Sequence, residues 1–198
     1  MPPTCMGGMK KVTTIILLSA AIGIVFAFAS TLALIADISE YRSNFFSSSQ
    51  PVATVYVFLK ENCPISRYHT KTLSQLYLRY AKNGIVFRGH VASSKATKQS
   101  VAAFRAKFDI PFIVEPDACL KKAQHLGAKV TPEVVLRNQD GKTLYQGRID
   151  NTYADFGKRR RVTTSHDLRD VLKSLLNGET VEPKYTEAVG CLIPNPKH

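Results

Sequence analysis

The sequence of 198 residues has few cysteines and lacks the patterns of the common cofactor-binding folds. Its four cysteines are Cys5, Cys63, Cys119 and Cys191. It contains no glycine-rich phosphate-binding loop and no flavin or nicotinamide fingerprint. We therefore expect no cofactor, so that any reducing equivalents come from another protein or from a small thiol. The sequence also has no internal repeat and no long low-complexity tract.

Acidic residues are scarce as well. Asp and Glu total 15 against 27 Lys and Arg, which gives a formal net charge of +12. Part of the positive charge is concentrated in one run, Lys158, Arg159, Arg160 and Arg161. Such a run can face water, an anionic membrane or an acidic partner. No nucleic-acid-binding motif accompanies it, so we expect a solvated surface and no nucleic-acid partner.

The first part of the chain contains a long apolar run. Residues 15–36 carry no charge, and about 22 residues suffice to cross a bilayer core of about 30 Å. The region also has the layout of a signal peptide, with a basic start at 9–11, an apolar core at 12–26 and a small-x-small site at 27–29. We favour retention as a membrane anchor, because residues 32–35 prolong the apolar run.

Both interpretations export the rest of the chain. Lys10 and Lys11 precede the apolar run, and no comparable basic cluster follows it closely. We expect a protein that is tethered to the membrane through residues 15–36 and faces the periplasm or the extracellular side, or one that is secreted after cleavage near Ala29. The predicted organisation is a signal anchor or signal peptide (1–36), a polar linker (37–51), one folded domain (52–182) and a tail with Cys191 (183–198).

Beyond the linker, hydrophobic periodicity alternates strands and helices. The pattern predicts extended segments at 55–59, 85–87, 111–114, 134–136 and 143–149, the last two joined in a hairpin by a tight turn. Helices are predicted at 64–81, 96–108, 117–125 and 165–176. Gly84 ends the first of them, and the third is capped by Asp117 and ended by Gly127. This order gives an α/β sandwich with a mixed central sheet flanked by helices.

Cys63 lies between the first predicted strand and the first predicted helix. Unpaired N–H groups at a helix N-terminus carry roughly half a positive charge, which favours the thiolate and makes such a cysteine nucleophilic near neutral pH. A dithiol redox site would have a second cysteine where this chain has Ser66. Disulfide chemistry at Cys63 must therefore recruit a partner thiol from elsewhere.

Several separated motifs resemble one known group of proteins. Cys63 followed by Pro64, and Thr131 followed by Pro132, resemble the thioredoxin fold, in which the second proline is typically cis and faces the thiol. Residues 109–117 resemble the insert shared by peroxiredoxins and membrane-tethered thioredoxin-like reductases. Segments 144–151, 164–169, 175–178 and 189–193 resemble the peroxiredoxin-like redoxin proteins of the alkyl hydroperoxide reductase and thiol-specific antioxidant superfamily. The resemblance spans residues 52–193.

The resemblance implies a thiol oxidoreductase that acts in thiol-disulfide exchange or peroxide defence. Cys63 would attack a disulfide or a peroxide, next to Thr131 and Pro132, and the Ser66 hydroxyl would hydrogen-bond the thiolate. A second thiol would resolve the resulting mixed disulfide or sulfenic acid. Residues 60–62 replace the threonine-containing pattern that precedes the reactive cysteine of true peroxiredoxins, so the hydroxyl that organises the peroxide is absent.

Two of the three other cysteines are candidates for the second thiol. Cys5 precedes the apolar run, and we assign it no role. Cys191 lies in a turn-rich tail that we expect to be mobile, and we favour it as the partner of Cys63. Cys119 falls in a predicted helix, where we expect a buried structural cysteine, and it is the alternative resolving thiol.

Two further interpretations stay open. Together with Cys63 and Cys191, the side chains of His69 and His90 would make a soft thiolate and imidazole site suited to copper. Copper chaperones of the thioredoxin fold use a Cys-x-x-x-Cys pair that this chain lacks, and each histidine alone is more simply a hydrogen-bonding residue. The last interpretation is a redox-inactive interaction module.

Overall fold

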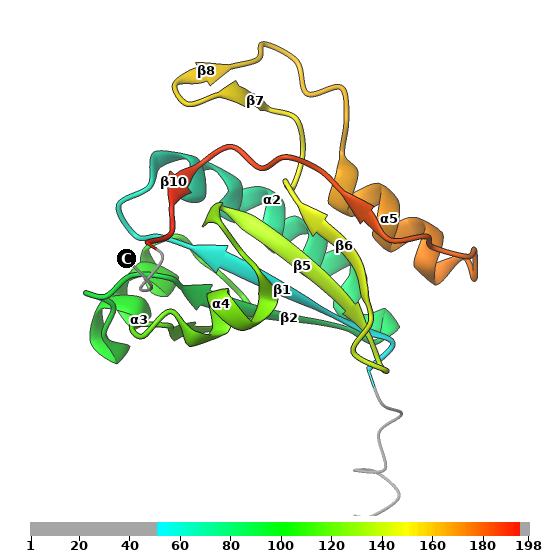
Figure 1. Ribbon diagram of the computed structural model, residues 1–198, viewed down its shortest axis with the longest axis horizontal. Helices are drawn as coiled ribbons and strands as arrows, with labels where there is room; N and C mark the ends of the chain where they lie inside the picture. Colours follow the sequence, from blue (N-terminus) through cyan, green and yellow to red (C-terminus); the bar gives the residue numbers. More distant parts are fainter. Residues whose placement is uncertain (1–50, 195–198) are drawn as a thin grey trace, which may run out of the picture. The chain divides into compact units, whose positions relative to one another are not determined.

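The computed structural model of the protein describes residues 51–194 (Figure 1). The predicted signal anchor or signal peptide, Cys5 and nearly all of the predicted linker lie outside these residues. Within the part of the chain that is described, no helix is both long and apolar enough to cross a membrane. The tether at 15–36 and the export of the domain therefore stay predictions.

A mixed sheet forms the centre of the domain, with its strands in the order β3-β2-β1-β5-β6-β9. β1 (Ala53–Leu59), β2 (Ile85–Val91) and β3 (Ile113–Pro116) are parallel to one another. β5 (Glu133–Asn138) is antiparallel to β1 and also to β6 (Thr143–Gly147), with which it forms the predicted hairpin. The predicted mixed central sheet is thus confirmed.

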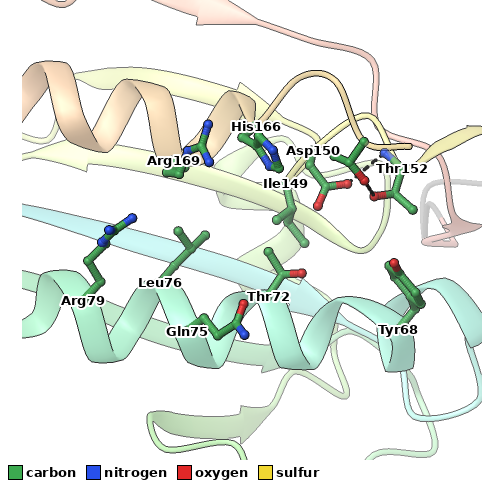
Figure 2. Close-up of a pocket in the computed structure, with 11 residues that line it drawn as sticks. Tyr68, Thr72, Gln75, Leu76, Arg79, Ile149, Asp150, Thr152, His166 and Arg169 are labelled. Atoms are coloured by element: carbon green, nitrogen blue, oxygen red, sulfur yellow. Dashed lines mark hydrogen bonds between the residues drawn. The ribbon is translucent and has the colours of Figure 1, made fainter. Parts of the chain in front are cut away.

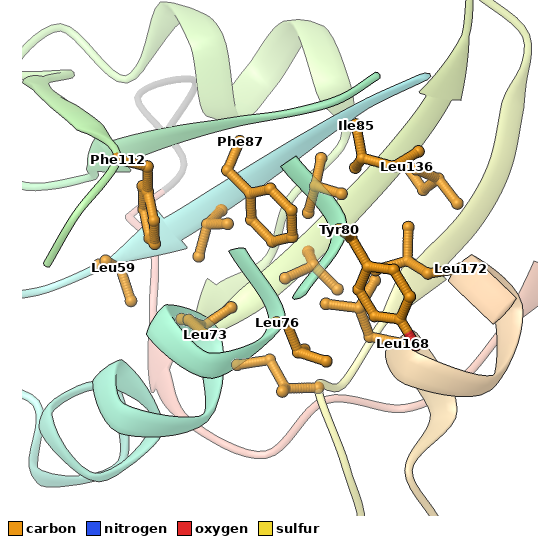
Figure 3. Packing of buried hydrophobic residues seen from close by; sticks show 14 of the residues in the cluster. Leu59, Leu73, Leu76, Tyr80, Ile85, Phe87, Phe112, Leu136, Leu168 and Leu172 are labelled. Atoms are coloured by element: carbon orange, nitrogen blue, oxygen red, sulfur yellow. The ribbon is translucent and has the colours of Figure 1, made fainter. Parts of the chain in front are cut away.

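Helices pack against this sheet through two apolar clusters. The helices are α2 (Pro64–Tyr80), α3 (Lys98–Lys107), α4 (Lys121–Leu126) and α5 (Asp167–Leu176), and a short 3-10 turn, η1 (Ala81–Asn83), follows α2. Leu73 of α2 and Leu172 of α5 belong to the larger cluster, together with Phe87 and Leu136 of the sheet (Figure 3). The second cluster contains Phe58, Ala92, Leu120, Ala123, Leu126 and Val135.

These clusters follow from the alternation of side chains along the strands. In β1, Val57 and Leu59 belong to the larger cluster whereas Phe58 belongs to the second one, because successive side chains of a strand point to opposite faces. The helix after Cys63 ends as predicted: Gly84, with a φ of 81°, closes η1 in the left-handed conformation that favours glycine.

α4 begins later than the sequence predicts. Leu120 adopts a left-handed conformation with a φ of 56°, so the helix starts only after it. The carboxylate of Asp117 accepts hydrogen bonds from the N–H groups of Lys122 and Ala123, at 3.2 and 2.9 Å. Cys119 therefore lies in an exposed turn and not in a helix, so the expected buried structural cysteine is wrong.

The structure also contains short strands that the sequence does not predict. β7 (Tyr153–Asp155) and β8 (Lys158–Arg159) form a hairpin that projects from the domain, and the basic run on it is exposed, as expected (Figure 1). In the tail, β9 (Lys184–Tyr185) joins the central sheet beside β6. Farther along, β10 (Cys191–Leu192) pairs with β4 (Val130–Thr131) in a separate small sheet.

Candidate active site at Cys63

Cys63 occupies the N-cap position of α2. Its backbone is extended, with a φ of −83° and a ψ of 118°, and Pro64 begins the helix. Proline suits the first helical position, because the N–H group that it lacks would have no partner within the helix. The Cys63 side chain is fully buried. The strand-to-helix junction predicted for this thiol is what the structure shows.

The Cys63 sulfur has several hydrogen-bond partners. In the thiol form it donates to the carbonyl oxygen of Thr131, at 3.1 Å. Burial raises the pKa of Cys63, but hydrogen bonds from the Cys191 side chain and from the backbone and side chain of Ser66 outweigh burial, and the net pKa is lowered. A lowered pKa favours the thiolate, which is the nucleophilic form of cysteine.

Thr131 and Pro132 lie opposite Cys63. The peptide bond between them is cis, and Thr131 is fully buried. The Thr131 hydroxyl donates a hydrogen bond to the carbonyl oxygen of Cys191 at 3.3 Å. The structure therefore brings together Cys63, Ser66, Thr131, Pro132 and Cys191, the five residues that the sequence nominates for catalysis.

Cys191 lies in β10, directly across from Thr131. Burial raises the pKa of Cys191, the hydrogen bond to Cys63 and the charge of Cys63 raise it further, and the result is about 11. Cys191 therefore keeps its proton at neutral pH, whereas Cys63 loses its proton more readily and forms the thiolate. The structure brings Cys191, and not Cys119, to Cys63.

The tail that carries Cys191 is anchored to the domain at two points. At the first point, the Thr186 N–H donates to the carbonyl oxygen of Gln146 at 3.0 Å, and its hydroxyl contacts the Tyr145 hydroxyl at 2.6 Å. At the second point, β10 pairs with β4, where a Cβ on Gly190 would overlap the carbonyl oxygen of Thr131. Only glycine allows this close approach.

Glu133 holds β4 in place, and the sequence does not reveal this role. Its carboxylate is buried and accepts the N–H groups of Lys129 and Val130, at 2.7 and 3.1 Å. The other carboxylate oxygen accepts from the Gln146 side chain at 2.9 Å. These hydrogen bonds fix the strand that faces Cys63.

His69 forms a buried pair with Asp150, a residue that the sequence does not nominate. The Nδ1 atom of His69 lies 3.0 Å from the Ile65 carbonyl oxygen, and Nε2 lies 3.1 Å from Oδ1 of Asp150. Burial raises the pKa of Asp150, but hydrogen bonds from His69 and Thr152 outweigh it and lower the pKa to about 2. Both ring nitrogens of His69 are thus engaged.

His90 lies apart from this pair. Its ring stacks on Tyr56, with centroids 6.1 Å apart, and packs against Phe58. Burial and the positive charge of Lys122 lower its pKa, and its Nε2 atom is buried without a hydrogen-bond partner.

The structure does not bring the four candidate copper ligands together. Among residues 51–194, no group of three or more His, Cys, Asp or Glu side chains is arranged to hold a metal ion. The expected set of Cys63, Cys191, His69 and His90 is therefore not assembled. His69 pairs with Asp150, and His90, on β2, packs against the rings of Tyr56 and Phe58 on β1.

Aromatic and basic side chains from the β7–β8 hairpin border the site. Tyr153 stacks edge-on against Tyr68, with ring centroids 5.5 Å apart, and the Arg159 guanidinium lies 5.0 Å from the Tyr68 ring centre. Burial raises the pKa of Tyr153, and the positive charge of Arg159 partly opposes this. Through Tyr68 the hairpin thus contacts the first part of α2, the helix that begins after Cys63.

Two cavities flank these elements. One, of about 440 Å³, lies between α2 and α5 and is lined by Arg79, Arg169 and His166, with Asp150 and Thr152 farther along (Figure 2). Its lining includes none of the five predicted catalytic residues. The other, of about 780 Å³, lies between α4 and the tail residues Leu192, Ile193 and Pro194.

The protein resembles several solved structures. No family model matches the chain, and no curated protein matches its sequence significantly. An uncharacterized conserved protein from Geobacillus kaustophilus is 22% identical, with a TM-score of 0.66 over 75% of this chain and 80% of that chain. A hypothetical protein from Sinorhizobium meliloti 1021 is 21% identical, with a TM-score of 0.66 over 75% of this chain and 82% of its own.

A less similar solved structure has a name that states a function. A putative thiol:disulfide interchange protein DsbE from Chlorobium tepidum is 16% identical, with a TM-score of 0.48 over 67% of this chain and 83% of its own. At these identities the comparisons concern the fold alone. The mixed sheet, the flanking helices and the cis Thr131–Pro132 bond opposite Cys63 give the chain a thioredoxin-like fold.

Proposed function

We propose that the protein is a thiol oxidoreductase that carries out thiol-disulfide exchange through Cys63. The observation that supports this most strongly is the placement of two thiols at one short strand: Cys63 is hydrogen-bonded to Thr131, and Cys191 pairs across from the same residue. The pKa of Cys63 is lowered, and burial and the contact with Cys63 raise the pKa of Cys191 to about 11. One thiol is thereby prepared to attack, and the other keeps its proton until a second step needs it.

In the proposed reaction, the Cys63 thiolate attacks one sulfur of a substrate disulfide. A bond forms between Cys63 and that sulfur, and the other substrate sulfur leaves as a thiolate. Cys191 then gives its proton to the leaving thiolate and attacks the Cys63 sulfur, which releases the second substrate thiolate. The substrate gains two electrons, and the protein is left with a Cys63–Cys191 disulfide that a reducing protein or a small thiol reduces again.

A disulfide fits this site better than a peroxide. The hydroxyl that organises peroxide in peroxiredoxins has no counterpart in residues 60–62. Of the two hydroxyls beside Cys63, Ser66 accepts a hydrogen bond from the Lys60 N–H at 3.3 Å and Thr131 donates to Cys191. Peroxide defence and a peroxiredoxin-like identity remain predictions of the sequence resemblance, as do export and the membrane tether.

The proposal is tested by disulfide reduction with the purified full-length protein. A disulfide-bonded peptide is the substrate and a small dithiol the reductant. Cys63→Ser should abolish turnover, whereas Cys191→Ser should accumulate a mixed disulfide at Cys63. Cys119→Ser is the matched control and should keep full activity, because that thiol lies in an exposed turn. Equal turnover by the wild type and by Cys63→Ser would contradict the proposal.

A further inference from the structure

The cavity between α2 and α5 has no part in the reaction proposed for Cys63. Its volume of about 440 Å³ is that of a small-molecule site, and its lining does not include Cys63 or Cys191. Figure 2 shows α2 along one wall and α5, with the segment that leads into it, along the other. The side chains of these two walls therefore determine what the cavity can bind.

Cationic and hydrogen-bonding groups gather at one end of this cavity. Arg79 comes from the last turn of α2, whereas His166 and Arg169 come from the start of α5 on the opposite wall (Figure 2). Within residues 51–194, the side chains of Arg79 and His166 make no hydrogen bond or ion pair. Arg169 pairs at 3.1 Å with its exposed neighbour Asp170, a contact of little strength in water. This end therefore has positive charge that no buried carboxylate balances.

Asp150 does not supply the missing counterion. Among the lining residues that the structure describes it is the one acidic side chain, and it lies toward the end that Tyr68 lines (Figure 2). Its Oδ1 atom is already engaged by His69 at 3.1 Å and by the Thr152 N–H at 2.9 Å. The cavity is thus positive at one end and has an internally paired carboxylate at the other.

The middle of the cavity is partly apolar and partly polar. Leu76 and Ile149 line it with side chains that are otherwise buried in the larger apolar cluster. Thr72 and Gln75 line it from α2, and in the part of the chain that the structure describes their side chains make no hydrogen bond. A bound molecule would thus find free hydrogen-bonding groups beside a small apolar surface.

We propose that this cavity binds a small phosphate ester, with the phosphate between Arg79 and Arg169 and with His166 as a further donor. Guanidinium groups pair with phosphate oxygens through two parallel hydrogen bonds. A phosphate monoester has three free oxygens and close to two negative charges at neutral pH, enough for groups on both walls, whereas a carboxylate has two oxygens and one charge. The cavity is larger than a phosphate ion, so a short polar body has room over Leu76 and Ile149. This inference goes beyond the proposed function and does not depend on it.

Isothermal titration of the full-length protein with glycerol 3-phosphate tests the site. We expect one bound molecule per chain, and Arg79→Ala should weaken binding at least about tenfold, because it removes charge-assisted hydrogen bonds to the phosphate. Arg88→Ala is the matched control: it removes the same charge from an exposed position on β2 that does not line the cavity, and its affinity should equal that of the wild type. The control is needed because a chain with a formal net charge of +12 attracts any anion.

Two further variants make the test independent of one substitution. Arg169→Gln, on the opposite wall, should also weaken binding at least about tenfold. Arg79→Lys keeps the charge but loses the planar fork, so its affinity should lie between those of the wild type and Arg79→Ala. Equal affinities in the wild type, Arg79→Ala and Arg88→Ala would overturn the inference, because they would show general attraction to a basic protein.

Other ligands define the chemical class. Inorganic phosphate should bind more weakly than glycerol 3-phosphate and should lose affinity in the same variants, since it lacks the organic body. Glycerol, which lacks the phosphate, should not bind. Succinate or inorganic phosphate binding as tightly as glycerol 3-phosphate would overturn the assignment to a phosphate ester, and so would the absence of saturable binding by both phosphate compounds.

A thermal unfolding measurement gives a second readout. A ligand that binds the folded state alone raises Tm, so glycerol 3-phosphate should raise Tm for the wild type and not for Arg79→Ala. Cys63→Ser should bind glycerol 3-phosphate as the wild type does, because Cys63 does not line the cavity. Absence of disulfide exchange would therefore leave this inference standing, and absence of phosphate binding would leave the proposed function standing.

Discussion

The Cys63 thiol donates a 3.1 Å hydrogen bond to the carbonyl oxygen of Thr131, which lies 68 residues farther along the chain. Thr131 is also the residue that faces Cys191 across the β4–β10 pair. The same short strand therefore contacts the nucleophile and aligns the second thiol with it. Any change that shifts β4 should alter both thiols together.

Loss of the Cys191 thiol should raise the pKa of Cys63. Burial already raises that pKa, and the hydrogen bond from Cys191 is the largest of the contacts that lower it. A hydrogen bond to a charged group is worth about 1.5 kcal/mol or more, so Cys191→Ala should move the midpoint of alkylation upward by about one pH unit. The measurement is the rate of iodoacetamide labelling against pH in a Cys119→Ser background.

The midpoint of this profile, and not the rate at one pH, is the diagnostic quantity, because removal of the side chain also changes access to Cys63. Glu187→Ala in the same background is the control and should leave the midpoint unchanged. An unchanged midpoint in Cys191→Ala would show that Cys191 does not stabilise the thiolate.

His90 should make the fold sensitive to mild acid. Burial and the charge of Lys122 lower its pKa, so the folded state binds fewer protons than the unfolded state. The contribution of neutral His90 is fully present above about pH 6.5 and is lost as the pH falls from there toward the lowered pKa. His90→Phe should lose less stability than the wild type between pH 7.5 and pH 5 in urea unfolding. An equal loss in both proteins would contradict this assignment.

The buried pair of His69 and Asp150 should stabilise the domain. Burial raises the pKa of Asp150, yet its hydrogen bonds hold the pKa at about 2, so its contribution is present above about pH 4 and is lost as the pH falls toward 2. Asp150→Asn should cost roughly 1 to 3 kcal/mol at pH 7, because it removes the carboxylate that takes part in buried hydrogen bonds with His69 and the Thr152 N–H. Asp155→Asn, at an exposed pair with Lys158, is the matched control and should cost nothing measurable by urea unfolding.

Side chains of the larger apolar cluster should contribute more to the free energy of unfolding than exposed side chains do. Leu172 is fully buried at the contact of α5 with the sheet, and Leu172→Ala should cost about 2 to 5 kcal/mol, since the lost transfer free energy is added to the cost of the cavity. Leu78 lies on the exposed side of α2, and Leu78→Ala should change stability by less than about 0.5 kcal/mol. Equal unfolding midpoints for the two variants would contradict the packing described for α5.

Local sequence signals predict the part of the fold that depends on neighbours along the chain. The strand before Cys63, the helix after it and the stop at Gly84 follow from periodicity and from one glycine, and all are observed. Asp117 caps α4 as predicted, but the helix begins later than the sequence predicts, because Leu120 adopts a left-handed conformation.

The parts of the site that the sequence did not predict depend on contacts between distant residues. His69 and Asp150 are 81 residues apart, and no local spacing marks them as a pair. The docking of β10 was missed for the same reason, because two residues are too few to show a strand period. The turn-rich composition of the tail carries no information about the surface that receives it.

Peptide mapping of the oxidised full-length protein by mass spectrometry shows whether Cys63 and Cys191 form the redox pair of this protein. After mild oxidation we expect a peptide linked through Cys63 and Cys191, which is absent from Cys191→Ser. The disulfide closes a loop of about 130 residues and should stabilise the oxidised form by more than about 4 kcal/mol in the chain-entropy model. A bond from Cys63 to Cys119, or two free thiols under the same oxidant, would refute the Cys63–Cys191 pair.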